Sequence, residues 1–221
     1  MTNTKTAIIL GATGLTGSLL LKKLLSDDSY ATIKLFSRKP SGIISPKIKE
    51  FIGDIIQLEN FASDFTADVV FCCIGTTKAK TKDESVYRTI DYGIPVKAAQ
   101  LAKENNISTF IVISAMGANI KSSIFYNRTK GEMERDVLLL EIPRTYILQP
   151  SLILGNRTEH RAGEKIAAFF MQFFTLFLIG GLKKYRAIEA KAIANTMFNL
   201  VGSKLESQIL ESDRIQEISE Q

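Results

Sequence analysis

The sequence predicts an α/β fold with a doubly wound parallel sheet, and three observations support this prediction. Short apolar runs alternate with helical stretches along most of the chain, which is typical of a parallel sheet with helices on both faces. The apolar runs are rich in Val, Ile and Phe, as expected for strands that are covered on both sides. A glycine-rich turn separates the first run from the first helical stretch. The 221 residues are enough for one well-buried domain, so we expect a single domain over residues 1–221.

The elements are expected in a regular order. Candidate strands lie at residues 7–10, 33–37, 49–52, 69–74, 109–114 and 144–149. Helical stretches are expected near residues 15–25, 58–61, 85–105 and 122–141. Residues 151–186 fit the alternation poorly, and we interpret them as a small helical C-terminal cap over the carboxyl ends of the strands, where such folds bind ligands. The tail after residue 203 is expected to end in a short strand and a frayed helix.

The glycine turn is the most informative local motif. It follows a buried strand and opens a helix, so its backbone N–H groups and the positive end of the helix dipole can hold a phosphate. Gly11 allows the tight turn, Gly14 lets a pyrophosphate approach the backbone, and Gly17 lets the helix lie close to the sheet. A structural turn without a ligand is the alternative. The candidate cofactor-binding residues here are Gly11, Thr13, Gly14, Leu15, Thr16 and Gly17.

The end of the second strand bears on the choice of dinucleotide. NAD-binding folds place a carboxylate there for the ribose hydroxyls, but this chain has Ser37, Arg38 and Lys39. A hydroxyl followed by two cations suits a 2′-phosphate, so the sequence favours NADP(H) over NAD. The alternative is that both cations are solvated turn residues.

The next two strand ends supply further cofactor candidates. Asp54 follows the third strand and can accept a hydrogen bond from an adenine amino group. Ile74, Gly75 and Thr76 follow the fourth strand, where Gly75 would let the backbone pass close to the cofactor. Simple turn chemistry would explain the same residues.

A tyrosine and a lysine form the candidate catalytic pair. Tyr126 and Lys130 lie four positions apart and are therefore neighbours on one face of a helix. The charge of Lys130 is expected to favour the phenolate and to lower the pKa of Tyr126, which would then exchange a proton with a carbonyl or an alcohol. Ser114 ends the fifth strand, where its hydroxyl can hold the substrate oxygen. A pair of surface neighbours is the alternative.

Composition excludes several classes of protein. The net charge of +5 is too small for the clustered basic face of a nucleic-acid binder. The single histidine, His160, has no cysteine or histidine cluster near it, so no metal site is expected. Cys72 and Cys73 lie in an apolar run and are interpreted as buried thiols. A reducing compartment and the lack of a signal peptide then predict a cytoplasmic protein.

A phenylalanine-rich segment follows at residues 166–179. It is shorter than the roughly 20 apolar residues that cross a bilayer, so no integral membrane span is expected. The segment is interpreted as a helix packed on the core or on a second subunit, which makes a homodimer an expectation. Arg157 and Arg161, just before it, are candidates for binding an anionic group.

Together these motifs resemble the short-chain dehydrogenase/reductases in their atypical or extended branch. Within that branch the chain is most similar to the Tat-interactive-protein-like NAD(P)-binding oxidoreductases. The resemblance runs almost end to end. It implies a Rossmann-type fold, NADP(H) as the cofactor, and catalytic roles for Ser114, Tyr126 and Lys130, with Lys130 also holding the ribose. It rests on residues 11–17, 37–38, 71–77, 114–118, 126–132, 148–150 and 183–186.

Two departures from the family pattern affect these expectations. The interval between Ser114 and Tyr126 is short, so Ser122 or Ser123 is an alternative source of the hydroxyl. The substrate half is also short, which leaves little protein to recognise a nucleotide sugar. The leading hypothesis is an NADP(H)-dependent oxidoreductase acting on a small carbonyl or alcohol. The alternatives are an NADPH-binding regulatory protein without turnover and a nucleotide-sugar epimerase-like enzyme.

Overall fold

The computed structural model describes residues 4–155, 180–206 and 208–221. Seven parallel strands form one sheet in the order β3-β2-β1-β4-β5-β6-β9. The order reverses between β1 and β4, the crevice where open α/β sheets bind ligands. The strands are β1 (Lys5–Leu10), β2 (Tyr30–Ser37), β3 (Ile48–Ile52), β4 (Val69–Cys72), β5 (Thr109–Ile113), β6 (Arg144–Gln149) and β9 (Gln208–Glu211).

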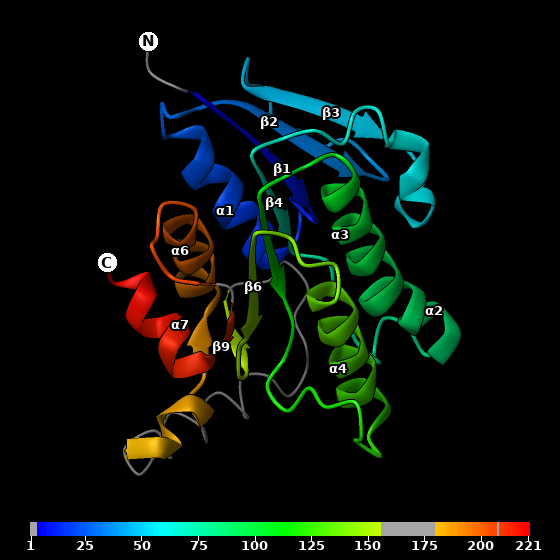
Figure 1. Ribbon diagram of the computed structural model, residues 1–221, viewed down its shortest axis with the longest axis vertical. Helices are drawn as coiled ribbons and strands as arrows, with labels where there is room; N and C mark the ends of the chain where they lie inside the picture. The colour runs from blue at the N-terminus through cyan, green and yellow to red at the C-terminus, as the bar shows by residue number, and fades with distance from the viewer. Residues whose placement is uncertain (1–3, 156–179, 207) are drawn as a thin grey trace.

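Helices cover both faces of the sheet (Figure 1). One layer contains α1 (Leu15–Leu25), α6 (Ala190–Leu200) and α7 (Ser212–Ser219), and the other contains α2 (Glu84–Arg88), α3 (Ile94–Glu104) and α4 (Phe125–Leu138). Alternate residues of each strand face opposite layers, as the two-residue period of a strand requires. In β1, Ala7 and Ile9 pack in the core under α1 and α6, whereas Ile8 and Leu10 pack in the core under α3 and α4. The predicted doubly wound parallel sheet is confirmed.

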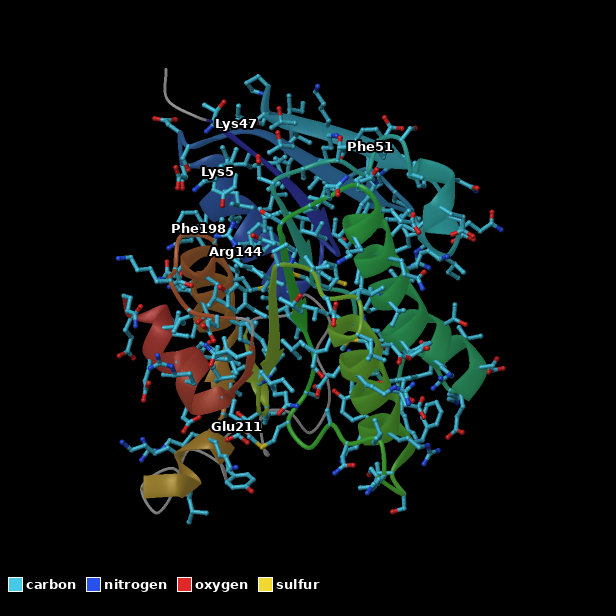
Figure 2. All side chains as sticks on the ribbon, viewed as in Figure 1. Lys5, Lys47, Phe51, Arg144, Phe198 and Glu211 are labelled. Carbon is cyan, nitrogen blue, oxygen red and sulfur yellow. The ribbon has the colours of Figure 1, made fainter. Side chains whose placement is uncertain are left out.

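Aromatic side chains pack together on one face of the sheet at the outer strand β3 and its neighbour β2. The ring of Phe51, labelled in Figure 2, stacks on Phe36 of β2 with the ring centroids 4.7 Å apart. Phe65 contacts the same Phe36 ring at 5.1 Å. Stacked and tilted ring pairs add to the stabilisation that comes from burial alone, so the β3 edge of the sheet is firmly packed.

Several helices differ in detail from the sequence-based expectation. The stretch expected at residues 85–105 is α2, then a π-helical turn η2 (Thr89–Gly93), then α3. The stretch near residue 58 is a 3₁₀ helix, η1 (Ile55–Phe61). The expectation of a frayed terminal helix is wrong, because α7 buries Ile215 and Ile218 and packs on α6. The short strand before it, β9, extends the main sheet beside β6.

Part of the expected cap lies outside the described residues, including the phenylalanine-rich segment, Arg157, His160 and Arg161. The described residues that flank it form a two-stranded sheet of β7 (Ile153–Leu154) and β8 (Ile188–Glu189), and a 3₁₀ helix, η4 (Gly180–Tyr185). Lys184 of η4 lies 2.9 Å from Glu211, which is labelled in Figure 2 at the start of α7. Among the described residues, no helix has the length and hydropathy of a membrane span.

Candidate functional site

The glycine turn between β1 and α1 forms a close backbone cradle. Gly11 has φ of +82°, and a Cβ atom there would lie 2.8 Å from the carbonyl oxygen of Cys73 at the end of β4. A Cβ atom on Gly17 would overlap the carbonyl oxygen of Gly11. Both positions therefore require glycine. Gly14 is the N-cap of α1, and no described side chain caps this end of the helix, so the first N–H groups of α1 are available to a phosphate, as in dinucleotide sites.

The other candidates in this turn differ in exposure. Thr13 and Gly14 are exposed, while Thr16 is buried. Leu15 packs beneath the chain at Gly155, where a Cβ atom would lie 2.9 Å from its side chain. The exposed backbone at Thr13 and Gly14 is thus the part of the turn that a phosphate can reach directly.

The end of β2 carries the residues predicted to select the dinucleotide, and the end of β3 carries Asp54, the residue predicted to bind the adenine. Arg38 and Lys39 are exposed just after β2, which is the neighbour of β1 in the sheet. The Ser37 hydroxyl donates a hydrogen bond to the Lys39 carbonyl at 2.7 Å. The Asp54 carboxylate accepts from the Ile56 N–H at 3.0 Å and caps η1, which is the turn chemistry considered as its alternative role.

The turn after β4 is held by a buried carboxylate that sequence reasoning did not single out. The N–H of Thr76 donates to Asp91 Oδ2 at 2.8 Å. A Cβ atom on Gly75 would lie 3.5 Å from Asp91 Oδ1, which is ordinary contact. Asp91 is 1% exposed and sits inside the π-helical turn η2. π-Turns are rare and are frequent at functional sites, but the sequence gives no local signal for one here.

Lys130 forms a buried ion pair with Asp91. Its Nζ lies 2.9 Å from Asp91 Oδ1 and 3.5 Å from the carbonyl oxygen of Ile113, at the end of β5. Burial is the largest single influence and would lower the pKa of Lys130, but the charge and hydrogen bond of Asp91, together with the nearby Tyr126 and Cys72, raise the pKa above its ordinary value. Lys130 is therefore a permanently charged group beneath the ends of β4 and β5.

Tyr126 lies one helical turn before Lys130 and is half-buried. The edge of its ring meets Tyr87 with the centroids 6.2 Å apart. The expectation that Lys130 lowers the pKa of Tyr126 below its usual value is wrong. Burial raises the pKa of this phenol, Lys130 lowers it only in part, and the charge of Asp91 raises it further. The main reason is burial, which disfavours the charged phenolate more than the charge of Lys130 favours it.

Ser114 is placed at the end of β5 as the sequence predicts, and it is 4% exposed. Its hydroxyl donates a hydrogen bond to Glu134 of α4, a second buried carboxyl that sequence reasoning missed. The spacing of Tyr126, Lys130 and Glu134, every fourth residue of one helix, was the available signal. The alternative serine Ser122 accepts from the Ile124 N–H at 3.1 Å and so helps to shape the loop before α4.

A parallel sheet with a glycine cradle at its crevice defines the class of NAD(P)H-binding proteins, and the family comparison agrees with this class. The chain belongs to the NAD(P)H-binding family, whose pattern it matches over residues 11–139. It is 38% identical over 156 residues to the protein FMP52-1, mitochondrial, of Scheffersomyces stipitis, covering 68% of each chain. It is 34% identical over 170 residues to the protein HTATIP2 of Rattus norvegicus, covering 75% of this chain and 70% of the relative.

A solved structure supports the fold. The Bordetella bronchiseptica enzyme WbmG in complex with NAD and UDP superimposes with a TM-score of 0.69 at 11% identity, covering 98% of this chain and 76% of that one. At this identity the likeness concerns the fold alone. The comparisons also correct one expectation. Three FMP52 relatives are named as mitochondrial proteins, which contradicts the expected cytoplasmic location.

Proposed function

We propose that this protein is an NADP(H)-dependent oxidoreductase that acts on a small carbonyl or alcohol. The observation that carries the proposal is the face of α4. It presents the Tyr126 phenol next to the buried charge of Lys130, which contacts the end of β5. Asp91 joins the same lysine to the Gly75–Thr76 turn. A proton-transferring phenol therefore stands at the strand ends where the fold binds a dinucleotide.

The residues fit such a cofactor. The cradle at Gly11 and Gly17 has no room for a side chain, and uncapped N–H groups of α1 suit a pyrophosphate. When bound, the nicotinamide supplies or accepts the hydride. Tyr126 donates a proton to the carbonyl oxygen during reduction and removes it from the alcohol during oxidation. Lys130 holds the ribose and stabilises the phenolate when it forms, and Ser114 holds the substrate oxygen.

Arg38 and Lys39 support NADP(H) as the cofactor within this proposal. Both are exposed beside the glycine turn, where a guanidinium can form charge-assisted hydrogen bonds to a 2′-phosphate. Asp54, Ile74, Gly75 and Thr76 complete the proposed cofactor site. A homodimer and a single functional domain belong to the same proposal on the strength of the sequence, and sedimentation of the purified protein tests the dimer.

The Tyr126→Phe substitution tests the catalytic role. We expect it to abolish NADPH-driven reduction across a panel of small aldehydes and ketones, because the proton donor is lost, while the Kd for NADPH changes less than about twofold. Tyr92→Phe is the matched control, since that phenol contacts Asp136 on the outer face of α4 at 2.7 Å. Turnover by the Tyr126→Phe protein would contradict the proposal.

A regulatory protein that binds NADPH without turnover is the second candidate. The raised pKa of Tyr126 favours it, since the phenol holds its proton more tightly than an activated catalytic tyrosine would. The two candidates differ in one measurement. If the protein is a regulator, the wild type binds NADPH but reduces none of the carbonyls in the panel.

A further inference from the structure

Glu134 is a buried carboxyl to which the proposed mechanism gives no role. It lies on α4 one turn beyond Lys130 and two turns beyond Tyr126, so the three side chains share one helical face. Glu134 is 5% exposed. The Ser114 hydroxyl donates to Glu134 Oε1, and Gln149 Nε2 lies 2.9 Å from each carboxylate oxygen. The proposed catalytic serine, Ser114, is thus hydrogen-bonded directly to Glu134, the second buried carboxyl of the site after Asp91.

The direction of the Ser114–Glu134 hydrogen bond limits what the serine can do. A serine hydroxyl has one proton and two lone pairs, and an ionised carboxylate can only accept. While Glu134 is ionised, the proton of Ser114 points toward it, and the serine can only accept a hydrogen bond from a substrate. A protonated Glu134 can donate to the Ser114 oxygen instead, which frees the serine proton for a carbonyl oxygen.

We propose that Glu134 is a positioning residue that sets the direction of the Ser114 hydroxyl. With Glu134 protonated, Ser114 can donate to the oxygen of a bound carbonyl. With Glu134 ionised, Ser114 can only accept, and it holds the alcohol form of the substrate instead. The inference rests on the proposed oxidoreductase function and assigns to this site a residue whose protonation decides which form of the substrate Ser114 can hold.

The surroundings of Glu134 make both protonation states accessible. Burial raises the pKa of Glu134, and this effect exceeds the opposing effects of the hydrogen bonds from Ser114 and Gln149 and of the Lys130 charge. The groups that face it are Ser114 after β5, Gln149 of β6 and Lys130 of α4. The charge of Lys130 is taken up by Asp91 at 2.9 Å. None of the ion pairs found among the described residues includes Glu134.

The first experiment needs no substrate. The full-length protein is labelled with glutamate carrying ¹³C at the carboxyl carbon, the Glu134 signal is assigned by its loss in Glu134→Gln, and its titration is followed by NMR. We expect a midpoint above that of exposed glutamates, and a further rise in Ser114→Ala, because the serine hydrogen bond stabilises the ionised form. Ser122→Ala is the matched control and should leave the midpoint unchanged. An ordinary midpoint, or one that Ser114→Ala does not move, overturns the proposal.

The second experiment measures how the rate of reduction depends on pH. NADPH-driven reduction of 9,10-phenanthrenequinone is followed against pH in the wild type, in Glu134→Gln and in Glu132→Gln. Glu132 is the control because it lies on the same helix and pairs with Arg88 away from the site. Above the NMR midpoint we expect the rate to fall about tenfold per pH unit in the wild type and in Glu132→Gln, the slope of one titrating group. In Glu134→Gln that fall should be absent, because its amide donates to Ser114 at every pH. The same fall in Glu134→Gln overturns the proposal.

The two experiments separate this inference from the function on which it rests. A wild-type protein without turnover contradicts the oxidoreductase function, while the NMR titration still decides whether Ser114 and Glu134 are coupled. A wild-type protein that turns over with no coupling between the two residues contradicts only the role of Glu134.

Discussion

At the scale of single residues, the Lys130–Asp91 pair is the most consequential contact in the site. Both side chains are nearly fully buried, and a charge so placed is tolerated only when it is paired. Asp91 also binds the N–H of Thr76. A single carboxylate therefore keeps Lys130 charged and fixes the backbone turn beside the proposed cofactor site.

Removing the carboxylate charge should cost much of the stability of the fold. We expect Asp91→Asn to lower the free energy of unfolding by about 3–5 kcal/mol, because it leaves Lys130 buried without a counter-charge. Urea denaturation measures the loss. Asp28→Asn is the control, since that side chain is fully exposed. The double substitution Asp91→Asn with Lys130→Met should lower the free energy of unfolding less than Asp91→Asn alone. Equal free energies of unfolding for Asp91→Asn and Asp28→Asn would contradict the argument.

Arg38 provides the test of cofactor choice. We expect Arg38→Ala to weaken NADPH binding by about 1.5–3 kcal/mol through the loss of a charge-assisted hydrogen bond, with little change for NADH. Titrations of both dinucleotides measure the difference, and Lys103→Ala, an exposed change at the far end of α3, is the control. Equal losses for NADPH and NADH would mean that Arg38 does not contact the 2′-phosphate.

At the scale of elements, sequence reasoning succeeded where the signal is local. The bounds of α1 and β6 agree with the expectation, and the glycine turn is predicted because its spacing reflects backbone contacts within one strand–helix unit. The partners of Lys130 and Ser114 were not predicted. Asp91 reaches Lys130 from another helix, and the Ser114–Glu134 bond joins a strand end to a helix, so both depend on tertiary packing.

The turn before α1 gives a prediction about an element. Gly17→Ala should lower the free energy of unfolding by about 1–3 kcal/mol, as overpacking does, because the added methyl group overlaps the Gly11 carbonyl. The displaced turn should also lose NADPH affinity. Thermal denaturation and NADPH titration measure the two effects. Gly202→Ala is the control, since a Cβ atom there meets nothing within 4 Å, and a fully stable Gly17→Ala protein would contradict the close contact.

At the scale of the whole molecule, the C-terminal segment completes the sheet. β9 pairs with β6, and α7 packs against α6, so residues far apart in the chain close one edge of the fold (Figure 1). The short strand and the terminal helix were expected from the sequence, but the pairing of β9 with β6 depends on tertiary packing and was not. The doubly wound class was predictable because it depends on the alternation of elements along the whole chain.

Buried Glu134 makes global stability depend on pH. Because its pKa is raised in the folded state, its contribution is fully present below the ordinary glutamate pKa of about 4.3 and is lost as the pH rises through the raised value. We therefore expect the wild type to lose stability relative to Glu134→Gln across that window and to keep a constant difference above it. Denaturation midpoints measured at a series of pH values, with Glu132→Gln as control, give the result. Parallel curves for all three proteins would count against a raised pKa.

The π-helical turn Thr89–Gly93 between α2 and α3 has a consequence for insertions and deletions in the gene. A π-turn is one residue longer than the α-helical turn it replaces, so loss of one codon here would give an unbroken and more regular helix. It would also rotate the preceding residues by about 100°, the angle of one helical step, and change their alignment with α4. We expect deletion of Thr89 to leave helix content by circular dichroism unchanged while separating the ring of Tyr87 from that of Tyr126, which the tyrosine fluorescence of the protein reports. The extra residue of the π-turn would then be what keeps the side chains of α2 aligned with those of α4.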